Sequence, residues 1–209
     1  MEFAQARRNM VESQVRVNDV TQPALIAALD RVARERLCAP ARAFAAYGEV
    51  EVEIAPGRSL MRARDVAKLI NALNVKPGQV ALAMAAPYAA AVLKDMGVEV
   101  TAQEADSRAV AVLADALDEA GVPLVAADFT APALTDVDLL ISEAGVAQLP
   151  QAWIDAVKVG GLLAVVLRNG PVGKAMLFLK TEAGVSGREL FDATPPTLAD
   201  FEPKPIFQL

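Results

Sequence analysis

The feature that most constrains the fold is a series of short, almost continuous apolar runs that starts near Lys76, for example "DVDLLIS" and "GLLAVVL". Strands with this composition are buried on both faces, which is typical of parallel sheets covered by helices. Segments with helical spacing of apolar residues separate the runs. This alternation predicts an α/β fold with a Rossmann-like, doubly wound sheet.

The same alternation predicts the individual elements. Strands are expected at 79–84, 98–103, 122–126, 137–142 and 161–167. Helices are expected at 87–96, 106–120 and 149–158, the last of them beginning at Pro150 and ending at Gly160-Gly161. Two further strands, joined at Glu182-Ala183-Gly184, are expected to follow, and the proline-rich end of the chain is expected to be extended.

Residues 1–75 differ from the rest because helical spacing dominates them. Helices are expected in "FAQARRNMVESQVRV", "TQPALIAALDRVA", "PARAFAAY" and "ARDVAKLINAL", with Thr21 as the cap of the second and Pro23 in its first turn. The segment "GEVEVEIAPGRSLM" predicts a short extended stretch and a loop. We therefore expect one structural domain, with a helical region at 1–75 packed on a core at 76–209.

The charge and composition argue against nucleic acid and membranes as partners. The net charge is −6 and only 5% of residues are aromatic, so the chain repels phosphates and offers few stacking platforms. No apolar run reaches the roughly 18 residues of a membrane span. We expect a cytoplasmic protein, a monomer or weak homo-oligomer. Its arginine clusters at 7–8, 31–36 and 58–64 are expected to form solvated helix faces, with attraction of acidic groups as the alternative.

The sequence contains no histidine and a single cysteine, Cys38. This composition excludes Ser-His-Asp and Cys-His catalysis, an internal disulfide and a cysteine-based zinc site, and we expect no metal. Cys38 is expected to be a small buried thiol and not a nucleophile. Any chemistry must therefore proceed without an imidazole.

The expected ligand site lies beyond the carboxyl ends of the strands, at the switch point after the first strand. The turn there reads Met84-Ala85-Ala86-Pro87 and contains no glycine. Glu104 follows the second strand, where an acidic residue holds a ribose hydroxyl pair in such folds; a solvated helix cap is the alternative. Asp128 follows the third strand and is placed to contact an adenine, with a turn aspartate as the alternative.

Several stretches together resemble the protein-L-isoaspartate O-methyltransferase family over nearly the whole chain. The closest matches are "MVESQV", "RERLCAPARAFAAY" and "KVGGLLAVV". The resemblance implies a core of the S-adenosylmethionine-dependent methyltransferase type, S-adenosylmethionine as methyl donor, and an isoaspartyl residue of a damaged protein as acceptor. Such repair chemistry needs no histidine, because the acceptor carboxylate is already ionised near neutral pH.

The donor turn departs from the family pattern. The family has roughly an acidic residue followed by Gly-x-Gly-x-Gly-Tyr, whereas this chain has the shorter "LAMAAPY". Met84 and Pro87 therefore stand at donor-binding positions, and only Tyr88 is retained. Alanine methyl groups obstruct the close backbone approach and the positive φ that glycines allow, so we expect donor binding to be weakened.

The acceptor loop and the fourth strand depart as well. The family reads Gly-x-Thr-Ile-Ser-x-Pro in the acceptor loop; here Ser59 keeps a hydroxyl at the threonine position, but Met61 replaces the serine that faces the substrate. At the end of the fourth strand, Glu143 puts a carboxylate near the donor pocket. This carboxylate is expected either to contact a cation or to repel an anionic acceptor.

These observations lead to one main hypothesis and two alternatives. The main hypothesis is a member of the family whose methyl transfer is weak or lost. The first alternative is a non-catalytic binding or scaffold protein that uses the old cleft or the basic N-terminal helices for a partner. The second is a methyltransferase with a different donor pose or acceptor.

Overall fold

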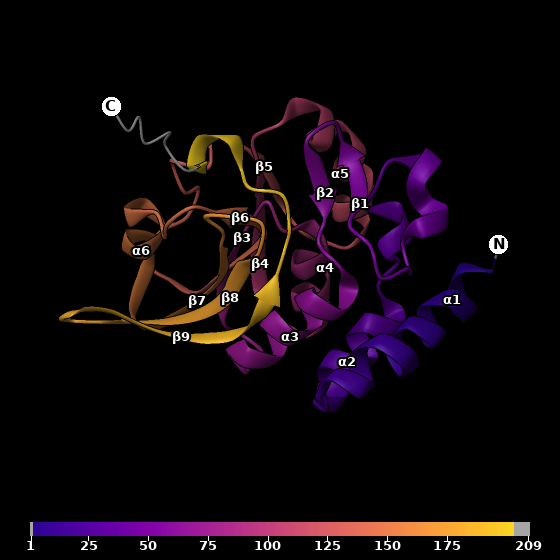
Figure 1. Cartoon of the computed structure of the whole chain (residues 1–209), viewed down its shortest axis with the longest axis horizontal. Helices are drawn as coiled ribbons and strands as arrows, with labels where there is room; N and C mark the ends of the chain where they lie inside the picture. Colours follow the sequence, from indigo (N-terminus) through magenta and orange to yellow (C-terminus); the bar gives the residue numbers. More distant parts are fainter. Residues whose placement is uncertain (1, 203–209) are drawn as a thin grey trace.

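A computed structural model describes residues 2–202 and has a central seven-stranded sheet with helices on both faces (Figure 1). The order of the strands is β5-β4-β3-β6-β7-β8-β9, in which β3 to β7 are parallel and β8 and β9 pair antiparallel. The strands are β3 Val80–Met84, β4 Glu99–Glu104, β5 Leu124–Ala126, β6 Val137–Val146, β7 Val157–Leu167, β8 Gly173–Thr181 and β9 Gly184–Ala193. This is the mostly parallel sheet that the apolar runs predict.

Both faces of the sheet are covered because alternate residues of each central strand pack into different layers. Ala81 and Ala83 of β3 belong to a core shared with three helices, whereas Leu82 and Met84 belong to a second core around Trp153. The three helices are α3 Ala63–Leu73, α4 Pro87–Asp95 and α5 Ser107–Glu119, and Trp153 lies on α6 Gln151–Ala156. Small alanines on the first face allow the helices to pack closely on the sheet.

The expected strands are confirmed and so are α4, α5 and α6, but the expected end of α6 is wrong. Instead of spanning 149–158, α6 ends at Ala156, because β7 begins directly at Val157, which pairs with Val137 of β6. Gly160 and Gly161 therefore lie inside β7 and do not end a helix. Gly160 has φ +86 and lies where the register between β6 and β7 shifts.

The N-terminal region is helical and packs on α3 and α4. Its elements are α1 Phe3–Met10, a π-helix Val11–Val15, α2 Pro23–Arg31 and 3-10 helices at Arg16–Asn18, Arg34–Arg36 and Pro40–Ala45. The expected cap Thr21 is wrong, because Gln22 precedes α2 and makes no side-chain cap hydrogen bond. None of the helices within residues 2–202 is long and apolar enough to cross a membrane.

Of the arginines expected to form solvated helix faces, Arg34 and Arg58 are buried, whereas Arg31 and Arg36 are exposed and also connect distant segments. Arg31 pairs with Asp95 of α4, and Arg36 pairs with Glu119 of α5. The expectation is therefore wrong for Arg34 and Arg58, whose guanidinium groups hydrogen-bond to acceptors in the interior. It holds for Arg31 and Arg36, whose side chains are 59% and 47% exposed. Cys38, by contrast, is buried as expected, and burial raises the pKa of its thiol.

Two segments lie over the carboxyl edge of the sheet. The first is the hairpin of β1 Val52–Ala55 and β2 Arg58–Leu60, which confirms the extended stretch expected there. The second is residues 194–202, here called the strap, in which Pro196 O accepts a hydrogen bond from Gly145 N at the end of β6. The strap is extended until a 3-10 helix at Ala199–Phe201. The rest of the proline-rich end, 203–209, lies outside the described residues.

Candidate functional site

The turn after β3 is buried and presents no open surface to a ligand. Met84, Ala85, Ala86 and Tyr88 each expose 1% or less of their surface, and Pro87 is buried as well. Ala85 has φ +52, a left-handed conformation that glycine adopts without strain and alanine does not. The turn thus keeps a backbone conformation suited to glycine, while alanine methyl groups fill the space beside it.

Glu143 reaches from β6 to the N-terminus of α4. Its Oε1 accepts a hydrogen bond from Ala89 N at 2.7 Å, and its Oε2 accepts one from Met61 N at 3.3 Å. The N–H groups and the dipole at a helix N-terminus form an anion-binding site. Here the protein's own carboxylate occupies that site. Glu143 is buried, and burial raises its pKa against the opposing effect of the Arg34 charge and the two N–H donors.

The ribose position at the end of β4 is also occupied from within the protein. Arg58 of β2 donates from Nη2 to Glu104 Oε2 at 2.8 Å and from Nε to both carboxylate oxygens at 3.2 Å. The backbone N–H groups of Ala105 and Asp106 donate to Glu104 Oε1 at 3.0 and 3.1 Å. The two side chains are only 8% and 2% exposed. Since a carboxylate has about four lone-pair sites, little accepting capacity remains for a ribose.

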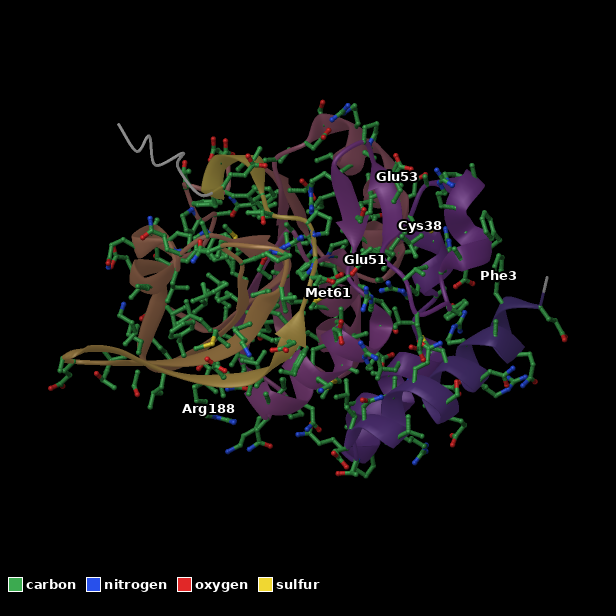
Figure 2. The ribbon with its side chains drawn as sticks, viewed as in Figure 1. Phe3, Cys38, Glu51, Glu53, Met61 and Arg188 are labelled. Atoms are coloured by element: carbon green, nitrogen blue, oxygen red, sulfur yellow. The ribbon has the colours of Figure 1, made fainter. Side chains whose placement is uncertain are left out.

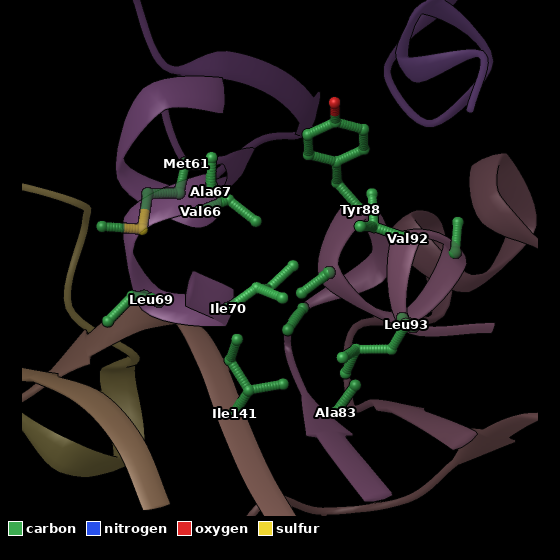
Figure 3. Packing of buried hydrophobic residues seen from close by; sticks show 14 of the residues in the cluster. Met61, Val66, Ala67, Leu69, Ile70, Ala83, Tyr88, Val92, Leu93 and Ile141 are labelled. Carbon is green, nitrogen blue, oxygen red and sulfur yellow. The ribbon is translucent and has the colours of Figure 1, made fainter. Parts of the chain in front are cut away.

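Met61 lies in the interior, between the β1–β2 hairpin and the sheet (Figure 2). Its carbonyl oxygen accepts a hydrogen bond from Nη2 of the buried Arg34, whose guanidinium carbon lies 4.6 Å from the centre of the Tyr88 ring. The Tyr88 hydroxyl points away from Ala83 and Ile141 of the sheet (Figure 3) and has no hydrogen-bond partner among residues 2–202. Met61 and Tyr88 therefore pack as core residues.

Two of the expected site residues lie apart from this centre. Ser59 is half-buried and points to the opposite side of the hairpin from Arg58, because successive strand residues alternate. Asp128 is exposed, and hydrogen bonds from the hydroxyl and N–H of Thr130 lower the pKa of its carboxyl. This is the geometry of a turn aspartate. Its neighbour Phe129 lies against Arg58 instead, with 5.9 Å between the guanidinium carbon and the ring centre.

A cavity of about 580 Å³ remains beside the Arg58–Glu104 pair. The turn of the β1–β2 hairpin, the start of α5 and the strap surround it, and Asp106 and Arg108 line it together with the pair. Among residues 2–202, the cleft is therefore closed at the turn after β3 and open on the outer side of the Arg58–Glu104 pair.

S-adenosylmethionine, which the family resemblance implies, does not fit these residues. Its methionine portion would need the turn after β3, where buried alanines stand, and its carboxylate would compete with Glu143 for the N-terminus of α4. Its ribose would need Glu104, which Arg58 already holds. Within residues 2–202, no three histidine, cysteine, aspartate or glutamate side chains are arranged to hold a metal ion.

Sequence reasoning missed Arg58 and Arg34, the two cations of this centre. A usable signal was present for Arg58, because residues 58 and 60 of a two-stranded hairpin share one face and Leu60 is apolar. A carboxylate at the end of a buried parallel strand also needs a partner. No comparable signal exists for Arg34, which lies in a 3-10 helix without an apolar repeat.

We expect the stability of Glu143→Gln relative to the unmodified protein to increase with pH. Because the pKa of Glu143 is raised on folding, its contribution to stability is fully present below the unfolded pKa of about 4.3 and is lost as pH rises through the folded pKa. Glutamine keeps an acceptor for Ala89 N and removes the titration.

The measurement is urea unfolding of both proteins at several pH values between 5 and 8. Glu12→Gln, which replaces a glutamate on the exposed face of the N-terminal region, is the matched control for the substitution itself. A pH-independent difference for Glu143→Gln would contradict the prediction.

Comparison with known proteins was made by sequence and by structure. No family model matches the chain. The protein-L-isoaspartate O-methyltransferase of Methylorubrum extorquens (strain PA1) is 32% identical over 198 residues, which cover 92% of this chain and 86% of that protein. That of Methylorubrum populi is 31% identical over 196 residues, covering 91% and 92%.

Among solved structures, the Plasmodium falciparum protein described as a beta-aspartate methyltransferase (PCMT), in complex with S-adenosyl-L-homocysteine, superposes with a TM-score of 0.75. The match covers 92% of this chain and 97% of that one at 15% identity. At this identity the match shows the fold alone.

Proposed function

The chain belongs to the protein-L-isoaspartate O-methyltransferase family, and we propose that its transfer of methyl groups from S-adenosylmethionine to isoaspartyl residues is weak or lost. One observation carries the proposal: the side chains at the donor and acceptor positions are buried against one another. Met61, Tyr88 and Glu143 each expose 1% or less of their surface. Protein atoms thus fill the space in which the two substrates would have to meet.

The reaction itself asks little of the side chains beyond positioning. An isoaspartyl carboxylate is ionised near neutral pH, and the donor, when bound, supplies an activated methyl group. The protein must then hold the two in line. In this chain Met61 offers no hydroxyl to hold the acceptor, and the Glu143 carboxylate would repel a second carboxylate nearby. These defects would persist even at saturating donor.

We expect S-adenosylhomocysteine to bind the unmodified protein with a dissociation constant of about 0.2 mM or weaker. Micromolar affinity corresponds to about −8 kcal/mol. Losing two or three backbone contacts, with an added steric conflict at the alanines, would remove roughly 3 to 5 kcal/mol. The measurement is calorimetric titration of the folded protein with S-adenosylhomocysteine.

The matched control is a family member with an intact glycine-rich turn, titrated under the same conditions. Saturable binding to this chain below about 10 μM would show that the remodelled turn still holds the donor, and would overturn the proposal.

A non-catalytic binding or scaffold role in the cytoplasm is the second candidate. The observation that favours it is that protein groups already occupy the cleft. Arg58 and Glu104 pair with each other, and Glu143 accepts hydrogen bonds from the backbone, so these residues make the contacts that a ligand would otherwise make. A cleft stabilised in this way remains folded without a cofactor. The partner in this case would be a protein surface.

A further inference from the structure

We infer that Arg58 determines the ligand specificity of the cleft, by excluding a ribonucleoside from Glu104. In the unmodified chain the guanidinium takes the place of the ribose hydroxyls. Without it, the cleft would accept the nucleoside half of the donor and still reject the methionine half. This inference rests on the proposed function, in which the chain rejects the donor. It assigns the rejection of the donor's nucleoside half to one side chain, Arg58, which lies outside the donor turn.

The first observation that supports the inference is the set of hydrogen bonds to Glu104. Both carboxylate oxygens accept from Arg58, and Oε1 also accepts from the N–H groups of Ala105 and Asp106. When Arg58 is removed, Oε2 loses every partner that it has within residues 2–202. A carboxylate with two free directions suits a vicinal diol, which presents two O–H donors side by side.

The second supporting observation is the cavity beside the Arg58–Glu104 pair. Arg58 and Glu104 both line the open space of about 580 Å³ outside the pair, so truncating the arginine would join its own volume to that space. A cavity of several hundred Å³ is the size at which small-molecule sites occur. The remaining charged groups around the opening include the carboxylates of Asp106, Asp200 and Glu202 against Arg108. This balance favours a neutral nucleoside over a nucleotide.

The third supporting observation is that protein groups already occupy the inner part of the cleft. Truncation of Arg58 leaves Glu143 on the N-terminus of α4 and leaves the buried alanines of the turn in place. A ligand that extends from the ribose toward α4 therefore gains no contact there. S-adenosylhomocysteine should therefore bind the truncated protein no more tightly than adenosine.

The experiment compares Arg58→Ala with Arg108→Ala and with the unmodified protein. Arg108 lines the same cavity but pairs with Asp106, so its loss matches the change in charge without freeing Glu104. Each protein is titrated calorimetrically with adenosine, 2′-deoxyadenosine and S-adenosylhomocysteine. We expect millimolar or tighter adenosine binding to R58A alone, at least about tenfold weaker binding of 2′-deoxyadenosine, and binding of S-adenosylhomocysteine no tighter than that of adenosine.

A second measurement guards against a general loss of structure in R58A. Methylguanidinium, which replaces the lost side-chain group, should raise the melting temperature of R58A more than methylammonium does at equal concentration, and should compete with adenosine. The more conservative Arg58→Gln, which also removes the charge, should bind adenosine if R58A unfolds.

Several outcomes would overturn the inference: folded R58A and R58Q that bind no adenosine, equal binding by R108A, or adenosine binding by the unmodified protein. The first of these would mean that the turn after β3 alone closes the cleft, and it would leave the proposed function intact. Tight binding of S-adenosylhomocysteine by the unmodified protein would instead overturn the proposed function.

Discussion

Replacing Glu104 with alanine should destabilise the protein by about 3–5 kcal/mol, because it leaves the Arg58 guanidinium buried without a counter-charge. Arginine cannot lose its proton at any pH at which the protein is folded. The only other acceptor that Arg58 has within residues 2–202 is Ala85 O, at a long 3.4 Å. A loss of this size is a large part of the total stability of an ordinary domain.

The two halves of the pair should not be equivalent. Arg58→Ala leaves Glu104 with the N–H groups of Ala105 and Asp106, and water from the adjoining cavity can hydrate the carboxylate. R58A should therefore cost clearly less than E104A. The double replacement Arg58→Met with Glu104→Leu should be close to neutral, since apolar residues of similar volume remove both desolvation costs.

Urea unfolding followed by circular dichroism measures these differences. Glu53→Ala is the matched control, because Glu53 pairs with Arg42 at the surface, with side chains 39% and 55% exposed, and such pairs contribute little. If E104A is as stable as the control, the buried pair does not form in solution.

The sheet could be predicted from sequence because continuous apolar runs leave few alternatives to buried parallel strands. The ends of α6 could not be predicted from the sequence. Residues around Val157 are apolar at both helical and strand spacing, so the local sequence does not distinguish a helix from a strand. Val157 lies in a strand because it pairs with Val137, twenty residues earlier in the chain. Gly161 belongs to the same pairing, since a Cβ there would lie 2.7 Å from Asp138 O. A glycine required by a close strand approach looks in sequence like a helix end.

The candidate site shows a similar division. The positions of Met61, Glu104 and Glu143 could be predicted from the strand order and the family pattern, but their partners could not. Arg58 and Glu104 are separated by 46 residues, and their contact depends on how the β1–β2 hairpin sits over the sheet. The sequence predicts that Glu143 contacts a cation or repels an anionic acceptor; in the structure the backbone N–H of Ala89, 54 residues away, donates a hydrogen bond to it, and the charge of Arg34 also acts on it. Pairing across the fold has no local signature.

The largest expected effect concerns catalysis: the unmodified protein should methylate an isoaspartyl peptide no faster than background at any practical donor concentration. A defect in donor binding alone would be overcome by raising the donor. Here the acceptor side is altered as well, through Met61, and a carboxylate stands near the reacting groups at Glu143. Both should lower turnover at saturation, because they act on the transition state.

Restoring single residues should not recover activity. Met61→Ser supplies the acceptor hydroxyl but leaves the donor site closed, and a rebuilt glycine-rich turn opens the donor side but leaves the acceptor unheld. Arg58→Ala alone should admit a nucleoside and transfer no methyl group. Activity should appear only when the turn, the serine at 61 and a neutral residue at 143 are introduced together with the loss of Arg58, by at least about 10²-fold over any single variant.

This dependence on a combination is the stronger test, because it separates a remodelled site from a merely inefficient one. Independent defects would add in free energy, so each single reversal would raise the rate by its own factor. If each defect by itself prevents donor and acceptor from meeting, no methyl transfer is measured until the last defect is removed. The assay follows a labelled methyl group from S-adenosylmethionine to an isoaspartyl peptide, with the ordinary aspartyl peptide as control. Clear turnover by the unmodified protein would mean that the buried side chains move aside in solution, and the chain would then act as an ordinary repair methyltransferase.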